Sequence, residues 1–180
     1  MKTFQAASRL KLLSFNPNSI GRNPKRSEIF HFLRDNKADI IFLSDTRLSK
    51  DVEAAVKQEW GGKAYFASHT SQARGVAVLI SKDLPIDIYE ETLYRDPSGN
   101  IIMFNCKFEN CIMSLCCLYG PNNDNPQFYE DILFPQIENL HILSILSWVV
   151  IGMSLLIIIL ILTVMLMSIT QRLKRRFRSI

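Results

Sequence analysis

Residues 10–43, LKLLSFNPNSIGRNPKRSEIFHFLRDNKADIIFL, decide the fold class. The two ends of this stretch, residues 10–15 and 39–43, are short apolar runs typical of buried strands. Residues 27–36, between them, place apolar side chains on one helical face: Ile29, Phe32 and Leu33. The order strand, helix, strand predicts an α/β fold.

Residues 52–60 have a helical pattern, and further β-rich runs follow them at residues 75–80, 86–89, 101–108 and 111–118. Only Glu109 and Asn110 separate the last two runs, which predicts a tight hairpin. Asn125 and Pro126 then supply the N-cap and first residue of an amphipathic helix. Its apolar face holds Phe128, Ile132 and Leu133, and we expect Pro135 to kink or end it.

The apolar run near the C-terminus predicts a membrane helix. No Asp, Glu, Lys or Arg occurs from residue 139 to 171, and thirteen of the twenty residues from Trp148 to Met167 are Leu, Ile or Val. Twenty helical residues rise about 30 Å, which is the thickness of the hydrocarbon core. A core helix of a soluble protein would keep a polar stripe. We therefore expect one transmembrane helix between about residues 143 and 168.

The formal net charge of +4 is concentrated in the tail. Five basic residues follow the apolar run, which leaves residues 1–171 at −1: Arg172, Lys174, Arg175, Arg176 and Arg178. Proteins that grip nucleic acid carry positive charge on the binding domain, so nucleic acid is disfavoured as a partner. A short basic run beside a membrane helix instead pairs with anionic lipid headgroups.

The four cysteines, Cys106, Cys111, Cys116 and Cys117, show no CxxC spacing and no accompanying His cluster, which disfavours a metal site. Two of them could pair across a hairpin, although buried free thiols are commoner in such strands. The sequence also has no Asn-x-Ser/Thr acceptor, which favours a cytosolic location for this domain.

Four motifs stand at the ends of the expected strands: Ser14-Phe-Asn16-Pro-Asn18, Phe42-Leu-Ser-Asp45-Thr46-Arg47, Ala73-Arg-Gly-Val-Ala-Val-Leu-Ile80 and Leu118-Tyr119-Gly-Pro-Asn122. In this order and spacing they resemble the endonuclease/exonuclease/phosphatase superfamily, most closely the endonuclease domain of LINE-type non-LTR retrotransposons. Those domains read roughly SFNVNGI, IFLQETHL, RGVAILI and YGPN. The likeness covers about residues 10–133, the N-terminal half to two-thirds of the family's domain. The family's later GDFN segment and catalytic His are missing.

The resemblance implies a four-layer α/β sandwich that hydrolyses phosphodiesters with Mg²⁺. Asn16 matches the family's first active-site Asn, and Asp45 falls where a metal-binding Glu is expected. Tyr119 matches the Tyr that approaches the phosphate, and Asn122 matches the Asn that supports it. These four residues are the candidate catalytic residues, with Asp45 as the candidate metal ligand.

Departures from the family pattern predict an inactive site. Asp45 is one methylene shorter than Glu, whereas Mg²⁺ requires oxygens at about 2.0–2.1 Å in near-octahedral geometry. Ser44 replaces the usual Gln, and Pro17 restricts the backbone of Asn16. None of the histidines before or within the apolar run has the flanking residues of the family's catalytic His: His31, His69 and His141. We expect the four matched residues to be vestigial, with no cofactor, or Mg²⁺ if any activity remains.

The chain is therefore expected to comprise a partial endonuclease-like domain (1–138), a transmembrane helix with its flanks (139–171) and a basic tail (172–180). Its fold class is α/β, a truncated half of the four-layer sandwich followed by one C-terminal transmembrane helix. We expect the protein to act by binding or through its membrane helix. Two alternatives stay open: a membrane-tethered Mg²⁺-dependent endonuclease or phosphodiesterase with residual activity, and a protein in which the transmembrane helix alone is functional.

Half a sandwich would leave apolar sheet surface uncovered. Besides membrane lipid, we therefore expect a protein partner or a homo-oligomer to cover it. The positive-inside rule would place the basic tail in the cytosol. Insertion as a tail anchor, with no leader, would instead keep the N-terminal domain cytosolic, and we prefer this single-pass arrangement.

Overall fold

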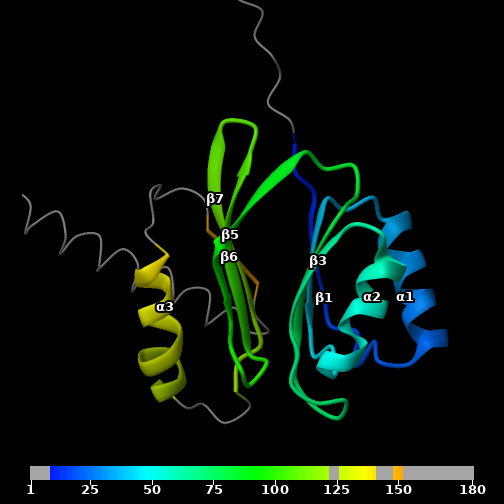
Figure 1. Cartoon of the computed structure of the whole chain (residues 1–180), viewed down its shortest axis with the longest axis horizontal. Coiled ribbons are helices and arrows are strands. Elements are labelled where there is room, and N and C mark those ends of the chain that lie inside the picture. Colours follow the sequence, from blue (N-terminus) through cyan, green and yellow to red (C-terminus); the bar gives the residue numbers. More distant parts are fainter. Residues whose placement is uncertain (1–8, 122–125, 141–147, 152–180) are drawn as a thin grey trace, which may run out of the picture.

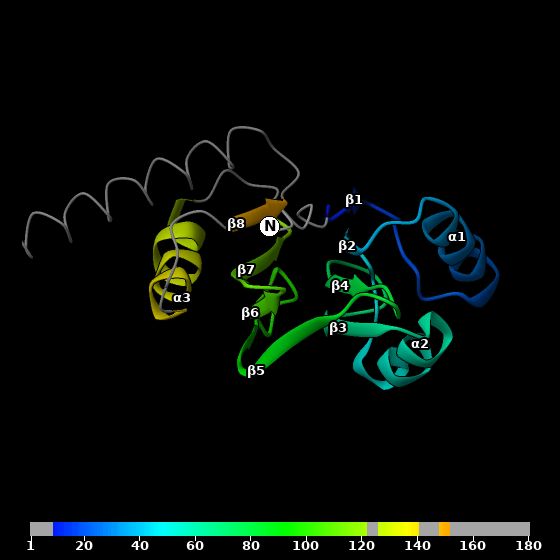
Figure 2. The same ribbon diagram turned by 90° about the horizontal axis from the view of Figure 1, so that it is seen from above.

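The computed structural model describes residues 9–121, 126–140 and 148–151. These residues form two four-stranded sheets packed face to face, with helices on both outer sides (Figure 1). The view from above separates the layers as helices, sheet, sheet and helix (Figure 2). The α/β prediction is confirmed. All four layers are present, each sheet with four strands, where the sequence predicted half a sandwich.

The first sheet has the strand order β1-β2-β4-β3. Its strands are β1 Leu12–Phe15, β2 Ile40–Ser44, β3 Lys63–Ala67 and β4 Val76–Ile80. Strands β1 and β2 are parallel, and the other two pairs are antiparallel. The outer face is covered by α1 Asn23–Asp35 and α2 Glu53–Trp60, the latter entered through a 3₁₀ turn, η1 Lys50–Val52. The predicted strand, helix, strand beginning is confirmed.

Helix α1 begins four residues before the predicted start. Pro24 lies in its first turn, where the missing N–H of a proline costs nothing. The helix buries Phe30 with Ile29 and Leu33, whereas Phe32 is 49% exposed and its ring lies beside that of Phe15, with centroids 5.6 Å apart. Phe30 therefore takes the core position that the sequence pattern gave to Phe32.

The second sheet has the order β5-β6-β7-β8. Its strands are β5 Ile86–Arg95, β6 Ile101–Phe108, β7 Cys111–Leu118 and β8 Trp148–Ile151. The predicted β6–β7 hairpin is confirmed. A π-helical turn, η2 Phe128–Leu133, leads into α3 Phe134–Asn139. Residues 126–139 are helical without a break, and the π-helical stretch lies directly before Pro135, so the helix is irregular at this proline but continues to Asn139.

Strand β8 differs from the predicted membrane helix. Its four residues pair in parallel with β7, from Ser114 opposite Trp148 to Cys117 opposite Ile151, so the helix prediction is wrong at these positions. Val149, Val150 and Ile151 are β-branched and suit the open edge of β7. The rest of the expected helix and the basic tail lie outside the described residues. Among the residues that the structure describes, no helix combines the length and the apolar composition of a membrane span.

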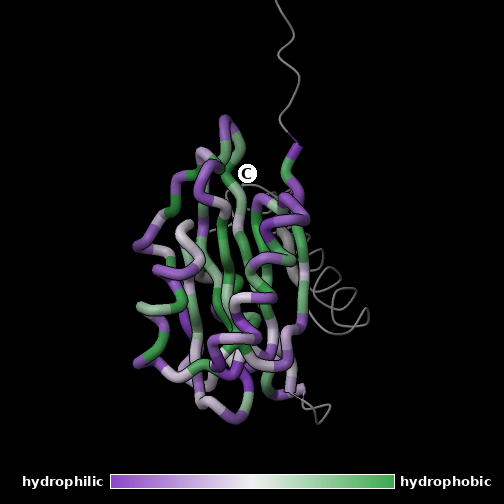
Figure 3. Tube along the Cα trace, turned by 90° about the vertical axis from the view of Figure 1, so that its right-hand side faces the viewer, coloured by the Kyte–Doolittle hydropathy of each residue, from purple (hydrophilic) through white to green (hydrophobic). Residues whose placement is uncertain are grey.

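The main core lies between the two sheets. Ile40, Phe42 and Val78 of the first sheet face Ile102, Phe104 and Leu115 of the second, all fully or almost fully buried. The strands are accordingly the most hydrophobic part of the trace (Figure 3). The inner face of each sheet is therefore covered within the chain, which differs from the expected uncovered sheet. The expected partner itself stays a prediction.

Candidate functional site

Asp45 and Tyr119 each follow a strand directly. Asp45 comes after β2, and Tyr119 comes after β7. These two strands pack against each other across the sandwich, since the Cys117 thiol donates to the carbonyl oxygen of Leu43 at 3.5 Å. The carboxyl ends of β2 and β7 thus bring two of the candidate residues to one end of the molecule.

Two further loops meet at this end because β4 and β6 run antiparallel to β2 and β7. Backbone hydrogen bonds join the loop after β2 to the loop before β4: Thr46 N–H to Gly75 O at 2.9 Å and Arg47 N–H to Arg74 O at 2.7 Å. The Tyr119 N–H donates to Asn100 O at 2.8 Å, and Asn100 Nδ2 donates back to Tyr119 O at 2.7 Å. The site therefore has a fixed backbone frame drawn from both sheets.

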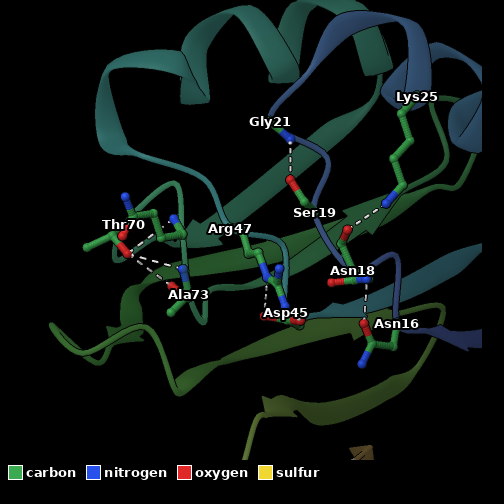
Figure 4. Close-up of polar contacts among 10 residues, drawn as sticks. Asn16, Asn18, Ser19, Gly21, Lys25, Asp45, Arg47, Thr70 and Ala73 are labelled. Carbon is green, nitrogen blue, oxygen red and sulfur yellow. Dashed lines mark hydrogen bonds and ion pairs between the residues drawn. The ribbon is translucent and has the colours of Figure 1, made fainter.

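Arg47 closes over Asp45 as a two-point ion pair (Figure 4). Its Nε donates to Asp45 Oδ1 at 3.1 Å, and its Nη2 donates to Oδ2 at 2.9 Å. The hydrogen bond to Asp45 raises the pKa of the Arg47 guanidinium. Both residues have left-handed backbones, with φ of 56° at Asp45 and 50° at Arg47, a conformation that costs non-glycine residues energy. Two strained residues thus turn the guanidinium back onto the carboxylate.

Beside this ion pair lies a pocket of about 370 Å³, which we call the Asp45 pocket. It is lined by Asp45, Arg47, Ala73, Arg74, Asn100, Tyr119, Gly120 and Pro121. Asp45 and Tyr119, two of the four candidate residues, therefore line the same pocket, and their catalytic role stays a prediction.

The other two candidate residues are not placed in this pocket. Asn16 is exposed and does not line it. The Asn16 Oδ1 accepts the Asn18 N–H at 2.9 Å, which makes Asn16 the first residue of an Asx turn (Figure 4). Asn122 lies outside the described residues.

The residues present do not fit a Mg²⁺ ion. Both carboxylate oxygens of Asp45 already accept hydrogen bonds from a guanidinium. Asp45 is the only carboxylate among the described residues that line the pocket, whereas Mg²⁺ prefers carboxylate and phosphate oxygens. Nor does the described part of the chain contain a cluster of three His, Cys, Asp or Glu side chains able to hold a metal. The pocket instead presents guanidinium groups.

Arg47, Arg74 and Asn100 are site residues that the sequence did not indicate as such. Two of them stand inside the quoted motifs: Arg47 occupies the place of His in the family's Gln-Glu-Thr-His, and Arg74 precedes the Gly of the third motif. Their positions inside the motifs could therefore have identified Arg47 and Arg74 as site residues. Asn100 stands in no motif, and its role depends on the contact between the β5–β6 loop and the end of β7.

Strand β8 is the strand after which the family's Gly-Asp-Phe-Asn segment, expected to be missing here, can be looked for. The resembled family continues after YGPN into a Gly-Asp-Phe-Asn segment, and β8 is the next strand of this chain. In the sequence Gly152 and Met153 follow this strand, and no Gly-Asp-Phe-Asn segment occurs in the printed sequence.

Known proteins are similar to this chain in sequence and in fold. No family model matches the chain. It is 25% identical over 126 residues to the transposon TX1 uncharacterized 149 kDa protein of Xenopus laevis, a match of 68% of this chain and 9% of that protein.

Two solved structures share the fold at low identity. The endonuclease domain of TRAS1, a telomere-specific non-LTR retrotransposon, has a TM-score of 0.53 at 13% identity, over 79% of this chain and 59% of that one. AP endonuclease LMAP from Leishmania major has a TM-score of 0.57 at 13% identity, over 79% and 54%. The resemblance carried by the four motifs is thereby confirmed, and the chain spans little more than half of these two solved chains.

Proposed function

We propose that this chain, which has the fold of the endonuclease/exonuclease/phosphatase superfamily, is a membrane-anchored, catalytically inactive endonuclease-like protein that acts by binding. The observation that carries the proposal is the two-point ion pair between Arg47 and Asp45. It occupies the carboxylate at the position where the resembled family holds its metal.

The ion pair opposes metal binding in two ways. A cation that bound Asp45 would have to replace two charge-assisted hydrogen bonds, which are the strong class of hydrogen bond. It would also lie beside the positive charge of Arg47. In addition, none of His31, His69 and His141 has the flanking residues of the family's catalytic His, and a positioned acid-base group is typically worth about 10²–10⁴ in rate. Little phosphodiester cleavage is expected from what is left.

A residual Mg²⁺-dependent endonuclease is the alternative. It is favoured by Asp45 and Tyr119, which line one pocket, and by structural neighbours whose names describe endonucleases.

Nicking of supercoiled plasmid separates these two functions. The full chain, purified in non-ionic detergent, is incubated with plasmid in Mg²⁺ and in EDTA, beside the Asp45→Ala variant. We expect no metal-dependent nicking from either protein. Metal-dependent nicking that survives purification and is lost in Asp45→Ala would overturn the proposal in favour of the endonuclease.

The membrane part of the proposal rests on the charge-free run of residues 139–171. Protease protection in intact and opened cells, with tags at both ends, tests it. We expect the N-terminal tag to be digested when only the plasma membrane is opened, as for a cytosolic domain. Release of the whole protein by carbonate would contradict an anchor. A chain reduced to residues 140–180 that keeps the cellular phenotype would assign the function to the helix alone.

A further inference from the structure

We infer that the Asp45 pocket binds the phosphate group of a ligand without a metal ion, using Arg47 and Arg74 as its anion-binding groups. This inference rests on the proposed function, because it requires the Arg47 guanidinium to stand in place of a metal. It names the ligand chemistry of the pocket, a phosphate ion or a phosphate ester.

The charge of the pocket favours an anion. Among its described lining residues, the two guanidiniums of Arg47 and Arg74 oppose the single carboxylate of Asp45, which leaves +1. The arrangement of donors points the same way. Arg47 uses Nε and Nη2 on Asp45, and its Nη1 has no hydrogen bond to another described residue. Arg74 is exposed, and its one side-chain hydrogen bond to a described residue, to Asn100 Oδ1, is long at 3.4 Å. Both arginines therefore keep donors for a ligand.

The backbone joins the two arginines that line the pocket. The Arg47 N–H donates to the carbonyl oxygen of Arg74 at 2.7 Å, so the two arginines are joined directly. Arg74 also has a left-handed backbone, with φ of 64°, like Asp45 and Arg47. Three strained non-glycine residues thus line one pocket, and strain of this kind persists where the surrounding structure fixes it. The planar guanidinium of Arg74, together with the remaining Nη1 donor of Arg47, matches the oxygens of phosphate better than a small halide.

The adjoining cavity has room for the group that carries the phosphate. It measures about 360 Å³ and shares Arg74, Asn100 and Pro121 with the Asp45 pocket. Its carboxylates, Asp96 and Asp131, suit ligand hydroxyls, and Asp96 Oδ2 already accepts the Asn100 N–H at 2.9 Å. The phosphate would therefore sit between the arginines, with any polar ester group on the side of Asn100.

Titration of the full chain in non-ionic detergent with inorganic phosphate, in EDTA, tests the inference. We expect wild-type protein to bind phosphate and Arg74→Gln to bind about tenfold more weakly, the change expected from one lost charge-assisted hydrogen bond. The matched control Arg22→Gln, an exposed arginine at the start of α1, should bind like wild type. Absence of phosphate binding in EDTA, or equal binding by Arg74→Gln, would overturn the inference.

Asp45→Asn gives the sharpest result. It removes the counter-charge of Arg47 and raises the charge of the lining residues from +1 to +2, so phosphate should bind more tightly. A site that held phosphate through a metal on Asp45 would lose affinity, and such a loss would overturn the inference. Metal-dependent nicking of plasmid, by contrast, would overturn the proposed function while leaving phosphate binding in EDTA to be judged separately.

Two further arms identify the source of the phosphate. Soluble inositol 1,4-bisphosphate stands for a lipid headgroup, and inorganic phosphate stands for the free ion. Tighter binding of the inositol phosphate supports a headgroup, and equal binding supports the free ion. Competition between the two probes is expected in both cases, and a lack of competition would contradict a shared site.

Discussion

The carboxamide of Asn105 donates a hydrogen bond from Nδ2 to the carbonyl oxygen of Leu140 over 3.0 Å, which joins the middle of β6 to the residue after α3. The last carbonyls of a helix have no partner within the helix. The Asn105 Oδ1 also accepts the Ser114 hydroxyl of the neighbouring strand at 2.7 Å. One side chain thus fixes the end of α3 to the second sheet.

Asn105→Ala should lower the free energy of unfolding by about 1–3 kcal/mol, because the substitution leaves the Ser114 hydroxyl and the Leu140 carbonyl without these partners. Urea denaturation of the full chain measures the loss, and hydrogen exchange of residues 134–140 should accelerate. Gln58→Ala is the matched control, since Gln58 is an exposed amide on α2. Unchanged exchange in α3 would contradict the assigned role.

Arg34→Ala should destabilise the first outer layer by about 1–2 kcal/mol. Arg34 Nη2 donates to the carbonyl oxygens of Glu59 at 2.7 Å and Trp60 at 3.2 Å, at the C-terminus of α2. Its guanidinium carbon also lies 5.5 Å from the Trp60 ring centroid. Arg34→Lys keeps the charge without the planar fork and should fall between wild type and Arg34→Ala. Equal urea midpoints for all three proteins would show that the contact adds no stability.

The double variant Asp45→Glu with Arg47→His should gain affinity for Mg²⁺ or Mn²⁺. It restores Glu-Thr-His as the resembled family has it, lengthens the carboxylate and removes the guanidinium that occupies it. Calorimetric titration with MnCl₂ measures the gain. Asp45→Glu alone retains Arg47 and should bind as poorly as wild type. Comparable binding by wild type and the double variant would contradict the blocking role of Arg47.

Stability should fall as the pH rises above about 8.5, the usual pKa of an exposed thiol. Burial raises the pKa of Cys106 and Cys116 to about 12, and in both cases desolvation is the largest cause. The folded state therefore keeps protons that the unfolded state loses between these two values, so the stabilisation present below pH 8.5 is lost as the pH approaches 12. Unfolding midpoints measured from pH 7 to 10 should show this slope. Cys116→Val should reduce it, and Cys111→Ser, at an exposed cysteine, should not.

The sequence predicted the strands whose residues are continuously apolar, because burial on both faces leaves no room for polar side chains. Strand β4 is such a case, with all five residues buried. Strand β3 was missed because Lys63 and Ala64 begin a run of only five residues that contains no β-branched residue. Strand β8 was missed because β-branched residues also suit a membrane helix, and the open edge of β7 is visible only in the fold.

For the site, the motif positions predicted that Asp45 and Tyr119 would meet, since both directly follow strands. The ion pair could not be predicted, because it depends on left-handed backbones at Asp45 and Arg47, a conformation that neither residue type requires. Asn16 was expected to be vestigial, and the structure gives its side chain a local role. Its side chain is taken up by a local turn with Asn18, which competes with any role in the pocket.

Strand β8 has a consequence for how the protein could sit at a bilayer. It uses four residues of the apolar run 143–168, and the seventeen residues from Gly152 to Ser168 follow it. A helix of seventeen residues would be about 25 Å long, less than the roughly 30 Å of the hydrocarbon core. A helix through the whole run and strand β8 therefore compete for the same residues. If the full run entered lipid, β7 would lose its pairing with β8. Trp148–Ile151 can therefore lie in the sheet or in the bilayer, but not in both.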